Sequence, residues 1–136
     1  VEGETFIEQI MKPHTPYYKA LKGILGKDCI HGMAHITGGG IEGNLCRVIP
    51  DGLSAVIDLD KIKTLPVFRF IRQCGNISDR EMLSTFNCGV GFIMVVQAEA
   101  AAQIAAHMNN YCECYEIGRI RTGEQKVVME NRLNWQ

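Results

Sequence analysis

Apolar and polar positions along the chain follow two alternating patterns. Segments in which apolar residues recur every three or four positions predict helices, and short continuous apolar runs predict buried strands. The predicted helices cover residues 6–11, 16–26, 41–49, 66–74, 78–85 and 98–110. The predicted strands cover residues 29–36, 53–59, 89–96, 115–120 and 126–130.

This order of elements predicts an α+β fold with α/β-like layers, in which helices cover a mixed β-sheet. The run at residues 89–96 is too continuously apolar to lie exposed, and we expect it to be a central strand. No internal repeat or second linker interrupts the sequence, so residues 1–136 are expected to form a single domain. The last residues, 131–136, are expected to fray.

The composition agrees with a compact domain and excludes some partners. Of the 136 residues, 46% are hydrophobic and 21% are charged, which suffices for a core. The 14 basic and 15 acidic side chains are spread along the chain, so no basic patch suggests a nucleic acid partner. No apolar run approaches the roughly 20 residues that span a bilayer, and the amino terminus lacks a signal peptide pattern. We therefore expect a cytoplasmic location and no membrane partner.

The six cysteines are scattered and lack a Cys-x-x-Cys pair. Most of them lie in apolar periodic segments, and we interpret them as reduced core thiols. One alternative is a disulfide framework, which a chain with this much aliphatic content does not need. The other is a zinc site, but no spacing of the cysteines fits zinc ligands. The sequence therefore predicts no metal ligands.

Residues 31–40, with the sequence HGMAHITGGG, join a predicted strand to a predicted helix through three consecutive glycines. Glycines let backbone N–H groups converge, and a helix start adds unpaired amides, so this loop can hold an anion such as phosphate. The alternative is a tight turn that only allows close packing. The glycine spacing matches neither a dinucleotide fingerprint nor a P-loop.

This loop and four later segments carry a resemblance to a known family. The later segments are NL and RVIP within residues 44–50, PVFR at 66–69, TFNCGVG at 85–91 and IGR at 117–119. In this order, from about residue 8 to residue 130, they closely resemble the carboxy-terminal domain of the aminoimidazole ribonucleotide synthetase family. That family is also called phosphoribosylformylglycinamidine cyclo-ligase.

The resemblance implies a step of purine biosynthesis. The expected reaction is the ATP-dependent ring closure of formylglycinamidine ribonucleotide to aminoimidazole ribonucleotide, with Mg²⁺ as cofactor. The resemblance also implies a homodimer of two-domain chains, in which the amino-terminal domain carries much of the ATP site and the dimer contact. The chain begins at Val1 without an initiator Met, and we expect it to be the carboxy-terminal half of such an enzyme, inactive by itself.

Within that resemblance, the glycine loop supplies the expected phosphate ligands. These are the Thr37 hydroxyl and the amides of Gly38, Gly39 and Gly40, and the phosphate belongs either to the ribonucleotide or to ATP. His35 lies two residues before Thr37, on the same side of an extended strand, and is the expected catalytic residue. It either contacts the phosphate or acts as an acid or base, and its alternative role is that of a structural, hydrogen-bonded imidazole. His14 and His107 are expected at the surface.

Four further residues are predicted to bind substrate or phosphate. Asn44 and Arg47 lie three positions apart on the predicted helix, so they either brace the loop or reach a substrate. Asn87 and Gly89 lie where a helix breaks into a strand, a common position for site residues. The sequence departs from the family at Ser84, where relatives have arginine, and at Cys88, where methionine is common.

Two other classes of function stay open beside the cyclo-ligase. Related domains occur in selenophosphate synthetases and thiamine-monophosphate kinases, although these do not share the HITGGG and TFNxGVG pair. A non-enzymatic role, as a stand-alone phosphate-ligand-binding or dimerisation module, is the second alternative.

Overall fold

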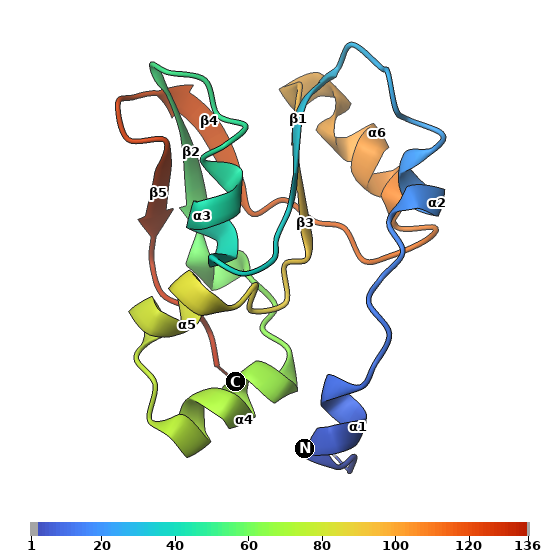
Figure 1. The fold of residues 1–136 in the computed structure, drawn as a ribbon. Helices are drawn as coiled ribbons and strands as arrows, with labels where there is room; N and C mark the ends of the chain where they lie inside the picture. Colours follow the sequence, from blue (N-terminus) through green and yellow to red (C-terminus); the bar gives the residue numbers. More distant parts are fainter. Residues whose placement is uncertain (1–2, 136) are drawn as a thin grey trace.

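A computed structural model of the chain describes residues 3–135. Its helices and strands alternate in the order that the sequence predicts (Figure 1). The helices are α1 (Phe6–Ile10), α2 (Tyr18–Leu21), α3 (Gly40–Leu45), α4 (Pro66–Gly75), α5 (Asp79–Thr85) and α6 (Ala98–Met108), with a short 3₁₀ helix at Leu59–Lys61. The strands are β1 (Ile30–His35), β2 (Leu53–Asp58), β3 (Phe92–Val96), β4 (Gly118–Thr122) and β5 (Val127–Glu130).

The expected α+β class with helices covering sheets is confirmed, but the strands divide into two sheets. Strands β1 and β3 form an antiparallel pair, and β2 lies between antiparallel β4 and parallel β5. Figure 1 shows the β1–β3 pair between the second sheet on one side and helices α2 and α6 on the other. The prediction that residues 89–96 form a central strand is therefore wrong, because β3 has a single neighbour.

The continuous apolar run of β3 has a different physical cause. Ile93 and Val95 pack in the core beneath the second sheet, whereas Phe92, Met94 and Val96 pack against the smaller core of α2 and α6. Successive strand residues point to opposite faces, so both faces of β3 are covered by side chains from different layers. A strand whose two faces pack against different cores therefore has the continuous apolar pattern of a central strand, although it pairs with only one other strand.

Several predicted elements differ in their bounds from the observed ones, and α2, α3 and β4 are examples. Helix α2 ends at Leu21, although the predicted stop at Gly26 does adopt a positive φ of 81°. Helix α3 ends at Leu45, four residues before the predicted end. Strand β4 starts at Gly118 because its register follows β2, with Gly118 opposite Ile57. Local patterns do not specify such pairings.

The chain near the carboxy terminus is packed, so the prediction of a frayed tail is wrong for the described residues up to 135. Leu133 is 6% exposed. The Trp135 indole Nε1 donates to Asp79 Oδ1 at 3.1 Å, and the Arg72 guanidinium lies 5.2 Å from the indole ring centre. These contacts fasten the segment to α4 and α5. Across residues 3–135, we find no helix with the length and apolar character that crossing a membrane requires.

Candidate functional site

The glycine loop turns sharply between β1 and α3. After β1, the Ile36 N–H donates to the Gly91 carbonyl at 2.9 Å, which ties the loop to the segment before β3. The Gly40 N–H donates to the Thr37 carbonyl at 3.1 Å and closes the turn. Gly39 and Gly40 have φ values of 95° and 63°, in the left-handed region that favours glycine. The predicted glycine turn is therefore present.

Gly40 is required by close packing as well as by its backbone angles. A Cβ atom at this position would lie 1.8 Å from the Leu83 carbonyl oxygen and 3.1 Å from that of Phe86. The loop thus rests directly on the end of α5. A Cβ at Gly38 would meet no atom within 4 Å, so this part of the loop faces open space.

Asn44 holds the loop from below. Its side chain is buried, with 6% exposure, and its Nδ2 donates to the carbonyl oxygens of Gly40 at 2.8 Å, Gly38 at 3.2 Å and Thr37 at 3.3 Å. Of the two roles considered for Asn44, the structure shows the bracing one. This amide keeps the loop carbonyls turned inward.

The inward carbonyls determine where the loop amides point. In a trans peptide the C=O and the following N–H point in opposite directions. Since the carbonyls of Thr37 and Gly38 face Asn44, the N–H groups of Gly38 and Gly39 point away from it. Neither N–H has a hydrogen-bond acceptor among residues 3–135, and both glycines are exposed. The Gly40 N–H is already bonded to Thr37, so two of the three candidate amides remain available.

The TFNCGVG segment forms a second tight turn beside the loop. The Asn87 Oδ1 accepts from the Gly89 N–H at 3.0 Å, and the left-handed residues Cys88 and Gly89 have φ values of 51° and 108°. A Cβ at Gly89 would lie 2.6 Å from the Lys63 carbonyl oxygen. Asn87 and Gly89 therefore shape the turn, and the Gly91 carbonyl joins it to the loop.

The two departures from the family pattern lie on and after α5. Ser84 is exposed, and its Oγ donates to the Glu81 carbonyl at 3.0 Å. Cys88 is fully buried, and its Sγ lies 3.7 Å from the Met82 carbonyl oxygen. Burial, and to a smaller extent the charge of Asp79, raises the pKa of the Cys88 thiol to about 11. The thiol stays protonated near neutral pH and is not a nucleophile.

His35 belongs to a group of four rings that the sequence analysis did not bring together. Its Nε2 lies 2.9 Å from the Nε2 of His14, and the two ring centres are 4.9 Å apart. Tyr17 and Phe92 complete the group, with ring centres 5.1 Å apart. We call His14, Tyr17, His35 and Phe92 the ring cluster. His14 is exposed, as expected, but no local signal in the sequence predicts its contact with a residue 21 positions away.

Tyr17 anchors the ring cluster to the TFNCGVG turn. A Cβ at Gly91 would lie 2.0 Å from the Tyr17 hydroxyl, so only glycine lets the phenol settle there. Burial raises the pKa of this hydroxyl, and a hydrogen bond with the Thr15 side chain partly offsets the rise. The Ile36 N–H donates to the carbonyl oxygen of the same Gly91, so the ring cluster and the loop both contact this residue.

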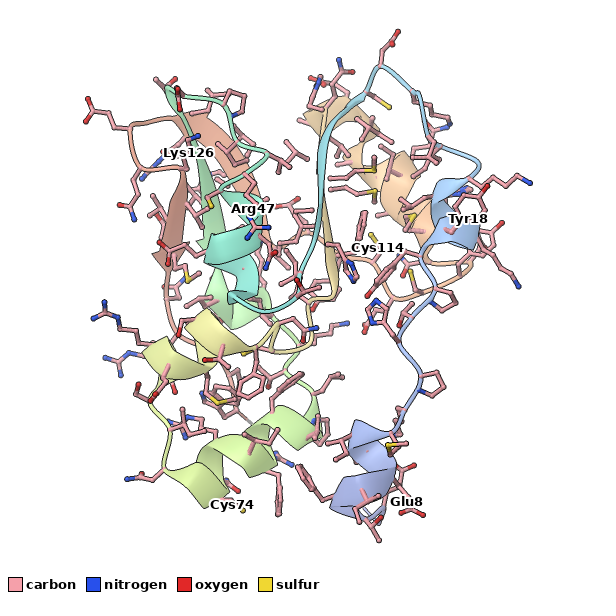
Figure 2. The ribbon with its side chains drawn as sticks, in the orientation of Figure 1. Glu8, Tyr18, Arg47, Cys74, Cys114 and Lys126 are labelled. Carbon is pink, nitrogen blue, oxygen red and sulfur yellow. The ribbon has the colours of Figure 1, made fainter. Side chains whose placement is uncertain are left out.

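Arg47 and two further histidines lie apart from this arrangement. Arg47 follows α3 (Figure 2) and is exposed, and its guanidinium makes no hydrogen bond or ion pair with another residue in the range 3–135. His31, four residues before His35, is also exposed and without such partners in the same range. The prediction that His107 is a surface residue is wrong, since it is half-buried with Nε2 2.8 Å from the Ala20 carbonyl oxygen.

A cleft of about 830 Å³ opens beside the loop but does not include it. Its walls come from β3, α6 and the segment 113–120, and it reaches the turn at Gly89. None of residues 35–40 lines this cleft. A ligand of the loop amides would therefore lie on the open face of the loop.

Comparisons with known proteins agree with the motifs. The family described as "AIR synthase related protein, C-terminal domain" matches residues 5–130. The phosphoribosylformylglycinamidine cyclo-ligase of Arabidopsis thaliana, named as chloroplastic, is 43% identical over 124 residues, which cover 90% of this chain and 32% of that protein. Those of Brevibacillus brevis and Methylobacillus flagellatus are 37% and 40% identical, over 99% and 93% of this chain. The chain spans 39% and 38% of their lengths, so about a third to two fifths of these relatives is matched.

Proposed function

The chain belongs to the AIR synthase related protein family, matching its C-terminal domain, and from this premise we propose that it is the carboxy-terminal part of a phosphoribosylformylglycinamidine cyclo-ligase. The proposed reaction is the ATP-dependent ring closure of formylglycinamidine ribonucleotide to aminoimidazole ribonucleotide. Because the match covers only 32% to 39% of the relatives' lengths, we assign the rest of the enzyme to an amino-terminal domain. That domain would hold most of the ATP site and the contact between two copies of the enzyme.

The glycine loop is the proposed phosphate site of this part. The observation that supports it is the Asn44 side chain, which keeps three loop carbonyls inward and leaves the amides of Gly38 and Gly39 outward. Two outward amides and the exposed Thr37 hydroxyl can together donate three hydrogen bonds to phosphate oxygens. The phosphate is that of the ribonucleotide or the one that ATP transfers. Arg47, with its exposed guanidinium after α3, is a further proposed contact.

Ring closure needs an activated amide and a place for protons. An amide oxygen leaves poorly, and phosphorylation by ATP converts it into a phosphate that an internal amidine nitrogen can displace. His35 lies at the end of β1, next to the proposed phosphate site, and imidazole is the side chain that most often acts as a general acid or base in enzymes. We propose His35 as the residue that takes up or supplies a proton during ring closure.

ATP and Mg²⁺ are proposed to bind mostly through the amino-terminal domain. Between residues 3 and 135 no group of three or more His, Cys, Asp or Glu side chains is placed to hold a metal ion. We derive no step through the metal. A cytoplasmic location stays a prediction, and the plant relative is named as chloroplastic.

The phosphate assignment is tested by Thr37→Val in the full-length enzyme, because valine keeps the shape of threonine without its hydroxyl. We expect the KM for the ribonucleotide or for ATP to rise about tenfold, the loss of one hydrogen bond to a charged group. The matched control is Thr122→Val, which removes an exposed hydroxyl from β4 and should leave both KM values unchanged. Equal kinetics of the two variants would refute a phosphate contact by Thr37.

The domain assignment is tested by adding the purified amino-terminal part to this chain. Alone, the chain should show no ATP-dependent ring closure, and the mixture should restore it. Turnover by the chain alone would contradict the two-domain proposal. Binding of the ribonucleotide with no turnover, in the mixture and in the full-length protein, would favour the stand-alone phosphate-binding module instead.

A further inference from the structure

The contact between His14 and His35 joins two parts of the chain that the proposed mechanism does not otherwise connect. Their Nε2 atoms are 2.9 Å apart, a hydrogen-bonding distance. His35 ends β1, whereas His14 lies in the extended segment before α2. A residue outside the motifs that carry the family resemblance thus touches the proposed proton-handling residue directly.

Two nitrogens at this distance share a single hydrogen. In a neutral imidazole one ring nitrogen carries a hydrogen and the other accepts one. One Nε2 of the pair must donate while the other accepts, because two N–H groups facing each other would repel. The contact therefore restricts the tautomers of both rings together. It also leaves Nδ1 as the nitrogen of His35 that is free for a ligand, since no residue in the described range 3–135 bonds it.

The position of His14 is held by Tyr17 rather than by its own burial. The His14 and Tyr17 ring centres are 5.5 Å apart in an edge-on arrangement, and Tyr17 also packs on Phe92. The Tyr17 hydroxyl in turn sits where Gly91 has no side chain. An exposed imidazole is thereby kept at a defined place, three residues before an anchored phenol.

We propose that His14 is a positioning residue that orients the His35 imidazole and sets its tautomer, so that His35 presents Nδ1 at the glycine loop. This proposal rests on the proposed cyclo-ligase function. Among the described residues, the titratable side chain in ring contact with both imidazoles is Tyr17, and the titratable group that acts on Tyr17 is Cys112. Both are neutral near pH 7, because burial raises the pKa of each above its ordinary value. Neither group therefore carries a charge that would act on the hydrogen shared by the two imidazoles.

The experiment uses the full-length enzyme with ¹⁵N-labelled histidine and three variants. His14→Phe keeps a ring against Tyr17 but has no nitrogen, and His14→Gln keeps a group that can donate or accept. His31→Phe is the matched control, since His31 is exposed and makes no hydrogen bond or ring contact in the range 3–135. The measured quantities are kcat, the KM for the ribonucleotide and the ¹⁵N shifts of the His35 ring.

His14→Phe should lower kcat about tenfold or more, as large as the loss when the hydrogen-bond partner of a metal-ligating imidazole is removed, with KM changed less than about twofold. The His35 Nε2 resonance should move at the same time. His14→Gln should restore much of kcat, and His31→Phe should match the unaltered enzyme. An unchanged His35 resonance, an unchanged kcat, or a rise in KM alone in His14→Phe would overturn the proposal. Absence of ring closure in the unaltered enzyme would count against the proposed function instead, and the ¹⁵N shifts would still decide whether the pair forms.

Discussion

Replacing Gly40 by alanine tests whether the loop is held against α5 as tightly as the structure shows. The new methyl group would stand 1.8 Å from the Leu83 carbonyl oxygen, a distance at which backbone must move. The residue would also have to keep a φ of 63°, which a side chain disfavours. Gly38→Ala is the matched control, because its methyl group would meet no atom within 4 Å and its φ lies outside the left-handed region.

The two costs can be estimated separately. A left-handed backbone costs a residue with a Cβ about 1–2 kcal/mol, and forcing extra volume into a packed contact costs about 1–3 kcal/mol. We expect Gly40→Ala to lower the free energy of unfolding by about 3 kcal/mol. With a urea m-value of about 2 kcal/mol/M for a chain of this size, the midpoint should fall by about 1.5 M. Gly38→Ala should leave it unchanged or raise it slightly, because alanine restricts the unfolded chain.

The measurement is urea unfolding of the 136-residue chain, followed by circular dichroism, for the unaltered protein and both variants. Midpoints of Gly40→Ala and Gly38→Ala that agree within about 0.3 M would refute the reasoning. Such a result would mean that α5 does not lie against the loop, and the inward arrangement of the loop carbonyls would lose its support.

Four further tests examine the rest of the packing. Asn44→Ala removes a buried amide that bonds three carbonyls and should cost about 2 kcal/mol in urea unfolding, against less than about 0.5 kcal/mol for the exposed control Asn110→Ala; equal losses would contradict the bracing role. At pH 8 the exposed Cys74 should react at once with a chromogenic thiol reagent, whereas Cys88 should react only after unfolding, and rapid reaction of Cys88 in folded protein would contradict its burial. Because folding raises the pKa of Cys88 from 9.0 to about 11, its contribution to stability is complete below pH 9 and should be lost as the pH rises towards 11. Trp135→Phe keeps an aromatic ring but removes the N–H that donates to Asp79, and it should lower the free energy of unfolding by about 1 kcal/mol. An unchanged urea midpoint would show that this hydrogen bond contributes nothing to stability.

Much of the local structure follows from the sequence because its signals act over a few residues. The Ser78 hydroxyl caps α5 by accepting from the Glu81 N–H at 3.3 Å, which is one of the two hydrogen bonds that a Ser and a Glu three residues apart favour at a helix start. Asn76 ends α4 with a φ of 47°, in keeping with the predicted stop at Gly75-Asn76. Glycine turns and helix caps of this kind depend on neighbours in the chain, so a single sequence is sufficient to place them.

The candidate site likewise combines features that the local sequence predicts with contacts that only the folded chain shows. The loop and the TFNCGVG turn were both predicted as site segments, and the hydrogen bond from Ile36 to Gly91 brings them together. The sequence left two roles open for Asn44, and only the folded chain shows its amide beneath the loop carbonyls. The binding roles of Thr37, Arg47 and His35 stay predictions, since they concern a ligand rather than the fold.

By itself the sequence determined the order of helices and strands, the glycine turn and the family to which the chain belongs, because each depends on residues near one another or on motifs in a fixed order. The tertiary structure alone decided how the strands divide between two sheets, that Trp135 packs on α5 and that His14 meets His35. These contacts join residues far apart in the chain: 21 positions for His14–His35, 56 for Asp79–Trp135 and 72 for the Ala55–Val127 pair of β2 and β5. Packing of side chains from different layers selects them, and no periodicity along the chain encodes that choice.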